Sequence, residues 1–193
     1  MKYIFIAIIS YLLGNISFAY ILGKLLTKKD VRDYGSGNAG TTNAIRAFGK
    51  KIGIMVFIGD VLKGVIAVLI GQSVLGELGG FIAGLFVIAG HNWPFLLKFK
   101  GGKGVATTIG VMLIINPFVT FICFIIGIVP IIITRMVSLG SVVGLSLAPI
   151  VILFFVRPFN FSLLVFGLII ASMSLYRHKA NIKRLIQGNE NKL

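Results

Sequence analysis

The sequence predicts an all-α protein that crosses a membrane several times. Three observations lead to this fold class. Hydrophobic residues make up 57% of the 193 residues, and only 12% of the residues are charged. This composition is typical of integral membrane proteins rather than of soluble domains. The apolar segments are also continuous runs, without the ten-residue alternation that marks an outer-membrane barrel.

Seven apolar segments are candidates for membrane-spanning helices. A span needs roughly 20 residues, because a helix rises about 1.5 Å per residue and the hydrocarbon core is about 30 Å thick. We find no repeat and no soluble domain, so residues 1–193 are predicted to form a single integral membrane domain. The predicted spans are residues 4–26, 53–72, 78–97, 105–116, 118–134, 137–156 and 160–177.

The fourth predicted span is short. Residues 105–116 would reach only about 18 Å as a helix, so the segment must tilt, re-enter or extend into the loop before it. Asn116-Pro117 divides the apolar run of residues 105–134 near its middle. Asn-Pro favours a turn, which predicts a hairpin of two helices rather than one long helix.

The positive charges favour one side of this topology. Sixteen of the nineteen Lys and Arg residues follow the first, third, fifth or seventh span. By the positive-inside rule, the N-terminus is then outside and the C-terminus is cytoplasmic. The sixteen residues are Lys24, Lys28, Lys29, Arg32, Arg46, Lys50, Lys51, Lys98, Lys100, Lys103, Arg135, Arg177, Lys179, Lys183, Arg184 and Lys192.

The same charge pattern limits the classes of partner. The formal net charge is +14, but positively charged cytoplasmic loops beside a lipid bilayer explain it, so no nucleic acid partner is expected. Cys123 is the single cysteine, which excludes an internal disulfide and a cysteine-based metal site. The loops also lack clustered aspartates, and we expect neither a metal ion nor another cofactor.

A polar loop follows the first span, and we call residues 35–43 the Ser36 loop. It reads GSGNAGTTN and is followed by Arg46. Glycines can turn backbone N–H groups toward an anion, and the polar side chains add neutral donors. A helix beginning after the loop would point its positive end at the same anion. The alternative is a flexible turn with one membrane-surface charge. The candidate phosphate ligands are Ser36, Gly37, Asn38, Asn43 and Arg46.

A second polar loop, which we call the Lys103 loop, covers residues 99–107 and reads FKGGKGVAT. Its glycines allow close approach of the backbone to a phosphate, and its lysine supplies a charge. The loop is not a P-loop, because Leu97 replaces the required first glycine and Gly104 follows the lysine. Anchoring of the lysines on anionic lipid is the alternative. The candidate phosphate ligands are Gly101, Gly102, Lys103, Gly104 and Thr107.

Two further groups of polar residues are candidates. In the C-terminal segment, residues 176–190, a helix would place His178 and Asn181 on one face, where both can reach one carbonyl centre. A basic amphipathic tail on the membrane surface is the alternative. Asp60 and Lys63 lie three residues apart within the second span. Buried ionisable residues indicate function by default, but a self-neutralising pair is the simpler interpretation.

Together these segments resemble the acyl-phosphate-dependent glycerol-3-phosphate acyltransferases of bacterial membranes. The matching motifs are GSGNAGTTN with Arg46, GHNWP followed by FKGGKGVAT, and YRHKANIKRLIQGNE. The resemblance implies a helical, multi-pass enzyme of the bacterial plasma membrane with its active site on the cytoplasmic face. Its reaction would transfer a fatty acyl group from acyl phosphate to the sn-1 hydroxyl of glycerol 3-phosphate. The enzyme that produces acyl phosphate would be a potential partner.

The resemblance also implies roles for residues. The two loops would hold the phosphates of the two substrates, with Ser141 as an additional donor, while His178 and Asn181 would act on the hydroxyl and the carbonyl. His91 and Glu190 would support them. The proton acceptor stays open among His178, His91 and a substrate phosphate.

Two other classes are testable alternatives. A coenzyme A-dependent acyltransferase of the His-x4-Asp type would need an aspartate where His91 is followed by Leu96 and His178 by Lys183. A membrane carrier for an anionic phosphate metabolite would need polar groups in the middle of the membrane. Only Asp60 and Lys63 meet that condition.

Overall fold

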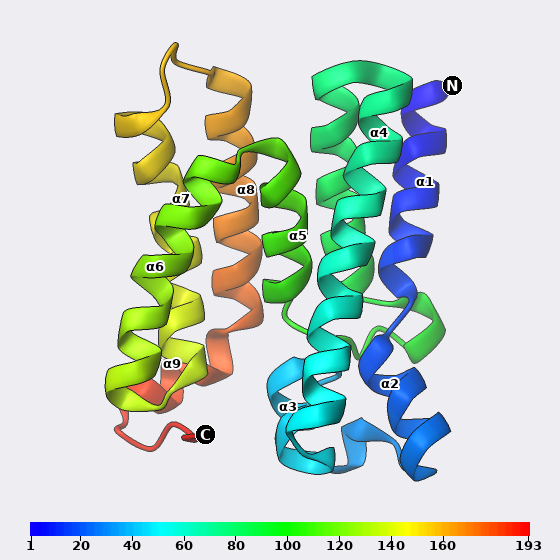
Figure 1. Cartoon of the computed structure of the whole chain (residues 1–193), viewed down its shortest axis with the longest axis vertical. Helices are drawn as coiled ribbons and strands as arrows, with labels where there is room; N and C mark the ends of the chain where they lie inside the picture. Colours follow the sequence, from blue (N-terminus) through cyan, green and yellow to red (C-terminus); the bar gives the residue numbers. More distant parts are fainter. The chain divides into compact units, whose positions relative to one another are not determined.

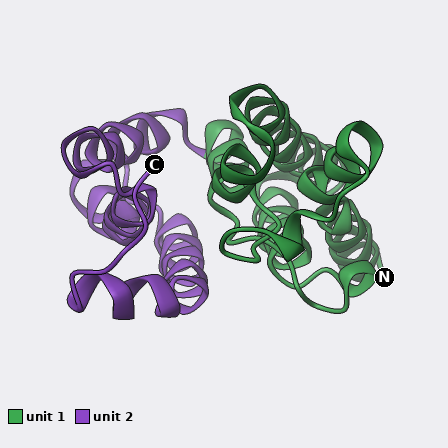
Figure 2. Cartoon of the chain, turned by 90° about the horizontal axis from the view of Figure 1, so that it is seen from below, with its two compact units in different colours: residues 1–115 green, residues 116–193 purple.

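The computed structural model describes residues 1–193 and consists of helices and connecting loops without a β-strand (Figure 1). This confirms the predicted all-α fold class. The chain divides into two compact units, residues 1–115 and residues 116–193, which are coloured separately in Figure 2. The expectation that residues 1–193 form one acyltransferase domain stays a prediction.

The first predicted span is not one continuous helix. Helix α1, Lys2–Asn15, ends before an extended Ile16, and Ser17 caps the short helix α2, Phe18–Leu22. A π-helical turn, η1, Gly23–Thr27, completes the segment. The side chain of Asn15 donates to the carbonyl of Tyr11 (2.7 Å) at the end of α1. Lys2–Thr27 as a whole is long and apolar enough to cross a membrane, as predicted for residues 4–26, although its helix is interrupted at Ile16.

The second and third predicted spans are the two arms of helix α4, Lys50–Asn92. The backbone leaves the helical conformation at Leu75 and Gly76, where Gly76 has a φ of +61° that favours glycine. The arms then lie side by side, because a Cβ on Gly71 would meet the backbone of Gly79 (Figure 1). The second arm ends at Asn92 and is followed by the 3-10 turn η3, Phe95–Leu97.

Close packing of α1 on α4 places the break in α1 beside the end of α4. A Cβ on Gly14 would overlap the backbone of Val87 and Gly90, and a Cβ on Gly90 would overlap the carbonyl of Tyr11. Small residues allow such close approach of membrane helices. As a result, the hydroxyl of Tyr11 donates to the carbonyl of Trp93 (2.8 Å), just beyond α4.

Two short elements form the polar end of the first unit. The 3-10 turn η2, Val31–Asp33, and helix α3, Thr41–Phe48, lie between the first two predicted spans. Their apolar side chains share a small core with α2 and α4, which contains Ala19, Val31, Ala39, Ala44 and Val56. Helix α5, Val105–Ile115, begins directly after Gly104 and packs against α4 (Figure 1).

The second unit contains helices α6, Pro117–Thr134, α7, Val137–Phe155, α8, Phe161–Arg177, and α9, Lys179–Ile186. Asn116 caps α6 by accepting a hydrogen bond from the amide of Val119 (3.0 Å). Pro117 occupies the first turn, where its missing N–H costs nothing. The predicted division at Asn116-Pro117 is therefore confirmed.

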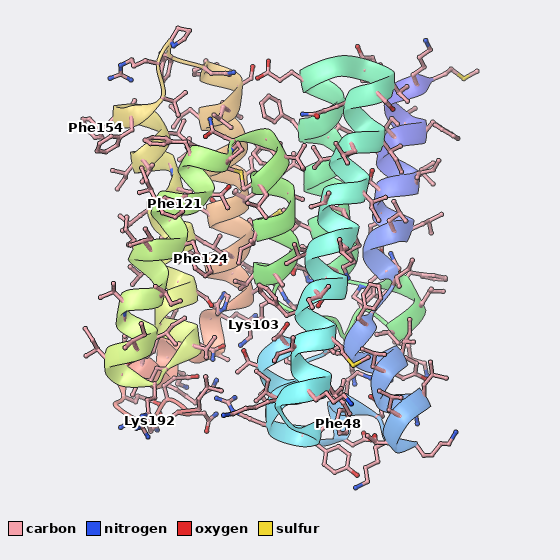
Figure 3. The ribbon with its side chains drawn as sticks, in the orientation of Figure 1. Phe48, Lys103, Phe121, Phe124, Phe154 and Lys192 are labelled. Atoms are coloured by element: carbon pink, nitrogen blue, oxygen red, sulfur yellow. The ribbon has the colours of Figure 1, made fainter.

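Exposed apolar side chains on these helices agree with a membrane protein. Phe121, Phe124 and Phe154 are 64%, 46% and 63% exposed, and Figure 3 shows them on the outside of the second unit. Water would disfavour so many exposed aromatic rings, whereas lipid would accommodate them.

The length and composition of the helices support several membrane crossings. Lys2–Thr27, Lys50–Leu97, Pro117–Thr134 and Val137–Phe155 are each long and apolar enough to cross a membrane. Helices α8 and α9 would add a fifth candidate if they form one span across their 64° bend. The number of seven crossings and the orientation of the termini stay predictions.

Candidate active site

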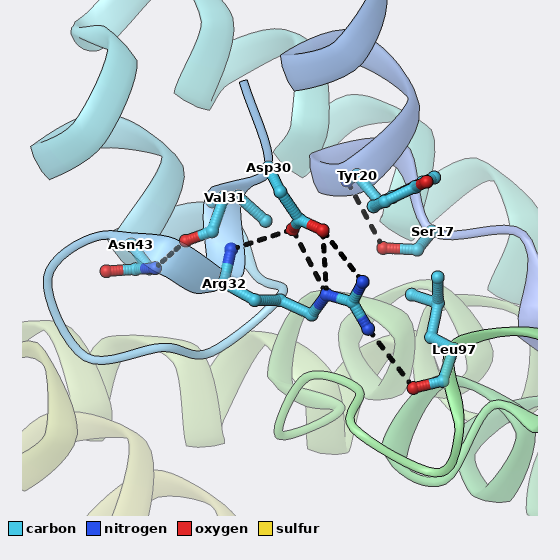
Figure 4. A network of polar contacts seen from close by, with 7 residues as sticks. All are labelled: Ser17, Tyr20, Asp30, Val31, Arg32, Asn43 and Leu97. Carbon is cyan, nitrogen blue, oxygen red and sulfur yellow. Dashed lines mark hydrogen bonds and ion pairs between the residues drawn. The ribbon is translucent and has the colours of Figure 1, made fainter.

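The Ser36 loop is held in shape by the side chain of Asn43. This side chain is 2% exposed and makes three hydrogen bonds to the backbone. Its Nδ2 donates to the carbonyls of Val31 (2.8 Å) and Tyr34 (2.9 Å), and its Oδ1 accepts from the amide of Ser36 (2.9 Å). Figure 4 shows the contact with Val31. We conclude that the Asn43 side chain organises the loop by bonding the backbone of other residues in and before it.

Helix α3 begins at Thr41, within the last residues of this loop, as expected for an anion-binding loop. Gly40 is its N-cap and provides no side chain to bond the first amides of the helix. Ser36 is exposed before the helix, Asn38 is half-buried, and Arg46 is exposed in its last turn. A helix N-terminus attracts anions through its N–H groups and its dipole. The loop thus combines backbone donors with one cationic side chain.

Arg32 connects the Ser36 loop region to the segment that leads into the Lys103 loop. Its guanidinium pairs with Asp30 (2.7 Å) and donates to the carbonyl of Leu97 (3.2 Å), as Figure 4 shows. The hydrogen bond from Arg32 holds the pKa of Asp30 below its ordinary value. The two loops therefore belong to one hydrogen-bonded assembly in the first unit.

The Lys103 loop folds onto the end of α4. The amide of Gly102 donates to the carbonyl of His91 (3.0 Å), and a Cβ on Gly102 would overlap the imidazole at Nε2. Gly104 has a φ of +78° and lies against the side chain of Asn92. Only glycine fits these two positions without displacing α4, so the glycines shape the loop.

The remaining candidates of this loop differ in exposure. Lys103 is half-buried two residues before α5, while Thr107 is fully buried in the first turn of α5. Lys103 is labelled in Figure 3. The Thr107 hydroxyl lies in the interior with no hydrogen-bond partner among the protein atoms. Its proposed contact with a phosphate stays a prediction.

Sequence reasoning did not select Asn92. This residue is completely buried, and neither atom of its amide has a hydrogen-bond partner. Buried polar groups are usually paired, because an unpaired group costs about 1 to 3 kcal/mol. Its position between the end of the second arm of α4 and Gly104 makes Asn92 a further candidate for the site. The signal in the sequence was an amide directly after His91, at the end of an apolar run.

In the second unit, His178 lies at the bend between α8 and α9. It is 2% exposed, and its Nδ1 lies 2.9 Å from the carbonyl oxygen of Ser174. A carbonyl can only accept, so Nδ1 carries the hydrogen of the neutral ring and Nε2 carries the lone pair. This tautomer is the one that a proton acceptor at Nε2 requires. His178 is the N-cap of α9, which contains Asn181, and α9 is bent by 64° from α8.

Asn181 and Glu190 form a second polar group in this unit. The Nδ2 of Asn181 donates to Glu190 (2.7 Å), and Arg184 pairs with the other carboxylate oxygen (2.8 Å). Glu190 thus pairs with one cation, Arg184 of α9, and also holds the amide of Asn181. Ser141 is buried in the first turns of α7, where its hydroxyl donates to the carbonyl of Val137 (2.9 Å). No set of three His, Cys, Asp or Glu residues could hold a metal ion.

The contacts of Glu190 predict a loss of stability in acid. Burial favours its neutral form, but the hydrogen bonds from Arg184 and Asn181 outweigh this effect and hold its pKa below the ordinary 4.5. Its contribution is therefore complete above about pH 4.5 and is lost as the pH falls through the lowered pKa of the folded state. Glu190→Gln should cost about 1.5 to 3 kcal/mol at pH 7.

Thermal unfolding in detergent checks this prediction. The difference in Tm between the unsubstituted protein and Glu190→Gln should shrink between pH 5 and pH 3. Glu77→Gln, in the exposed turn between the arms of α4, serves as the matched control. A difference that is constant across this range would contradict the prediction.

The helices and loops define a class: a polytopic membrane protein that presents glycine-rich, cationic loops able to bind anions. Comparison with known proteins specifies the family. The sequence model described as glycerol-3-phosphate acyltransferase matches residues 4–188. The chain belongs to this family, and it is a bacterial integral membrane protein.

Individual relatives agree with this assignment. The glycerol-3-phosphate acyltransferase of Clostridioides difficile (strain 630) is 48% identical over 100% of this chain and 96% of its own length. Two crystal structures of PlsY (YgiH), an integral membrane glycerol 3-phosphate acyltransferase, are 37% identical and cover 100% of this chain and 96% of theirs. The glycerol 3-phosphate form has a TM-score of 0.91, and the lysophosphatidic acid form has a TM-score of 0.89.

Proposed function

We propose that the chain transfers a fatty acyl group from acyl phosphate to the sn-1 hydroxyl of glycerol 3-phosphate. The products are lysophosphatidate and inorganic phosphate, in the first acylation step of phospholipid biosynthesis. The observation that carries this proposal is the family match over residues 4–188. The related PlsY was solved in forms with glycerol 3-phosphate and lysophosphatidic acid, which correspond to the acceptor and the acylated product.

The choice of acyl phosphate as donor rests on the loops and on the resemblance. Both substrates would then carry a phosphate, and the first unit offers two glycine-rich loops, for which Arg46 and Lys103 are the candidate cations. Arg32 bonds the carbonyl of Leu97, which connects the two loop regions. A cation beside each phosphate would offset the repulsion between the two anions, so that positioning supplies much of the rate enhancement.

In the proposed reaction, the hydroxyl oxygen of glycerol 3-phosphate attacks the carbonyl carbon of acyl phosphate. A new ester bond forms, the bond between the carbonyl carbon and the phosphate oxygen breaks, and phosphate leaves with its electron pair. Nε2 of His178 takes the hydroxyl proton, because Nδ1 already donates to Ser174. An amide has two N–H donors, so Asn181 can bond Glu190 and also stabilise the developing oxyanion.

The other predicted residues have supporting roles in this proposal. Ser36, Gly37, Asn38 and the amides at the start of α3 complete the site around Arg46, and Asn43 holds that loop in shape. Gly101, Gly102, Gly104 and Thr107 form the surroundings of Lys103, and Ser141 adds a donor. Glu190 keeps Asn181 in position. No metal ion or other cofactor takes part in the proposed reaction.

A membrane carrier for an anionic phosphate metabolite is the alternative function. An assay in detergent distinguishes an enzyme from a carrier, because acyl transfer by an enzyme needs no closed compartment. The purified protein should form lysophosphatidate from glycerol 3-phosphate and acyl phosphate in detergent micelles. A carrier would form none, and it would instead exchange labelled glycerol 3-phosphate across the membrane of proteoliposomes without added acyl donor.

We also propose that the loops face the cytoplasm, where both substrates and the enzyme that makes acyl phosphate would meet them. Single cysteines placed at Ser36 and Lys100 should then be protected from a membrane-impermeant thiol reagent in intact cells. A cysteine at the exposed Phe159 should react. All variants would carry Cys123→Ser. Labelling of Ser36→Cys and Lys100→Cys in intact cells would contradict this orientation, and labelling after lysis is the control for accessibility.

A further inference from the structure

A buried ionic network lies beneath the Lys103 loop and is used by neither proposed phosphate site. The Nζ of Lys63 lies 2.9 Å from Asp60 Oδ1 and 2.9 Å from His91 Nδ1, and all three side chains are at most 5% exposed. Lys63 also donates to the carbonyls of Gly14 (3.1 Å) and Ile16 (2.8 Å). Charged groups inside a membrane protein are costly, so a contact set of this kind calls for a function.

The network connects the break in α1 to the loop. The two carbonyls lie where α1 ends, and Lys63 replaces part of the hydrogen bonding that the broken helix loses. On the other side, His91 lies directly under Gly102, whose amide donates to the His91 carbonyl (3.0 Å). A side chain at Gly102 would overlap His91 Nε2. The position of the imidazole therefore sets the position of the loop backbone.

The distances also specify the tautomer of His91. An ammonium group has donors and no acceptor, so a contact of 2.9 Å with Lys63 is a hydrogen bond only if Nδ1 accepts. The carboxylate of Asp60 is farther from Nδ1, at 3.4 Å. A neutral ring that accepts at Nδ1 carries its hydrogen on Nε2. His178 has the opposite arrangement, because its Nδ1 donates to Ser174.

We infer that Lys63 and Asp60 are positioning residues that fix His91 as the Nε2–H tautomer beneath the Lys103 loop. His91 then acts as a hydrogen-bond donor on the loop side and does not accept the proton of the reaction. The link to catalysis rests on the proposed function, whereas the tautomer itself does not. The sequence left the proton acceptor open among His178, His91 and a substrate phosphate. A hydrogen on Nε2 of His91 removes His91 from these candidates.

Nitrogen NMR of the purified protein labelled with ¹⁵N-histidine tests the tautomer directly. The chain has two histidines, so His178→Gln identifies the signals of His91. At pH 7, His91 should show a protonated Nε2 and an unprotonated Nδ1. A protonated Nδ1, alone or together with Nε2, would overturn the inference. The double variant Asp60→Asn, Lys63→Met removes both charges together and should release the ring, giving signals of mixed tautomers.

Steady-state kinetics of His91 variants test whether His91 positions the Lys103 loop or accepts the proton. Glutamine places an amide near the position of Nε2, so His91→Gln should keep kcat within about threefold of the unsubstituted enzyme. His91→Phe should displace the loop and therefore raise KM by roughly tenfold or more. Leu62→Met, an exposed neighbour of Lys63 on α4, is the matched control. A loss of about 10² to 10⁴ in kcat for His91→Gln would identify His91 as the base and overturn the inference. Failure of the proposed function would instead appear as no acyl transfer by the unsubstituted protein, with the nitrogen signals unaffected.

Discussion

Replacing His178 with alanine should lower kcat by about 10² to 10⁴, with a much smaller effect on KM for either substrate. The reason is geometric. His178 is buried at the bend between α8 and α9, and its Nδ1 donates to the carbonyl of Ser174, so Nε2 has the lone pair needed to take a proton. Steady-state kinetics in detergent with both substrates varied would measure the two parameters separately.

A matched control distinguishes loss of the imidazole from disturbance of the bend. Lys179 is the next residue, is exposed, and stacks on Tyr176 at 4.8 Å from the ring centroid. Lys179→Ala should keep kcat within about twofold, because it removes an exposed contact only. A folded His178→Ala variant with unchanged kcat would assign the proton to a substrate phosphate instead.

Replacing Lys103 with methionine should instead weaken substrate binding. Loss of one charge from a partly buried ion contact costs about 2 to 5 kcal/mol, which corresponds to roughly 30-fold to several thousand-fold in affinity. Lys103 is half-buried between Gly102 and Gly104, whose backbones are fixed against His91 and Asn92. The main change should therefore appear in KM for one of the two phosphate substrates.

Lys100 supplies the control for this substitution. It lies in the same loop, carries the same charge and is exposed. Lys100→Met should change KM by less than about fivefold, because an exposed charge contributes about 1 kcal/mol or less. Equal effects of the two substitutions would indicate that the loop attracts anions by its net charge alone, without a specific site at Lys103.

Local sequence signals were sufficient for most helices. Long apolar runs predicted α6, α7 and α8 within a few residues, and Asn116-Pro117 predicted the division before α6. These elements depend on length, hydropathy and turn residues that lie next to one another in the chain. The break in α1 was missed because it depends on Lys63, which bonds Gly14 and Ile16 from a different helix.

The same distinction holds for the site. Composition identified the two polar loops, but it did not separate residues that can face a ligand from residues that shape the loop. Asn43 has the chemistry of a phosphate ligand, yet its amide bonds three backbone groups. The link from Lys63 to His91 joins residues 28 positions apart, and a sequence pattern carries no information on such a contact. Asp60 and Lys63 form the intrahelical pair that their spacing predicted.

The choice of acyl donor is the decisive test of the proposed reaction. Purified protein would be supplied with glycerol 3-phosphate and with either acyl phosphate or acyl-coenzyme A of the same chain length. Lysophosphatidate and inorganic phosphate would both be quantified, with and without a chelator of divalent metals. We expect equal amounts of the two products from acyl phosphate, little product from acyl-coenzyme A and no effect of the chelator. Faster acyl transfer from the thioester than from acyl phosphate would contradict it.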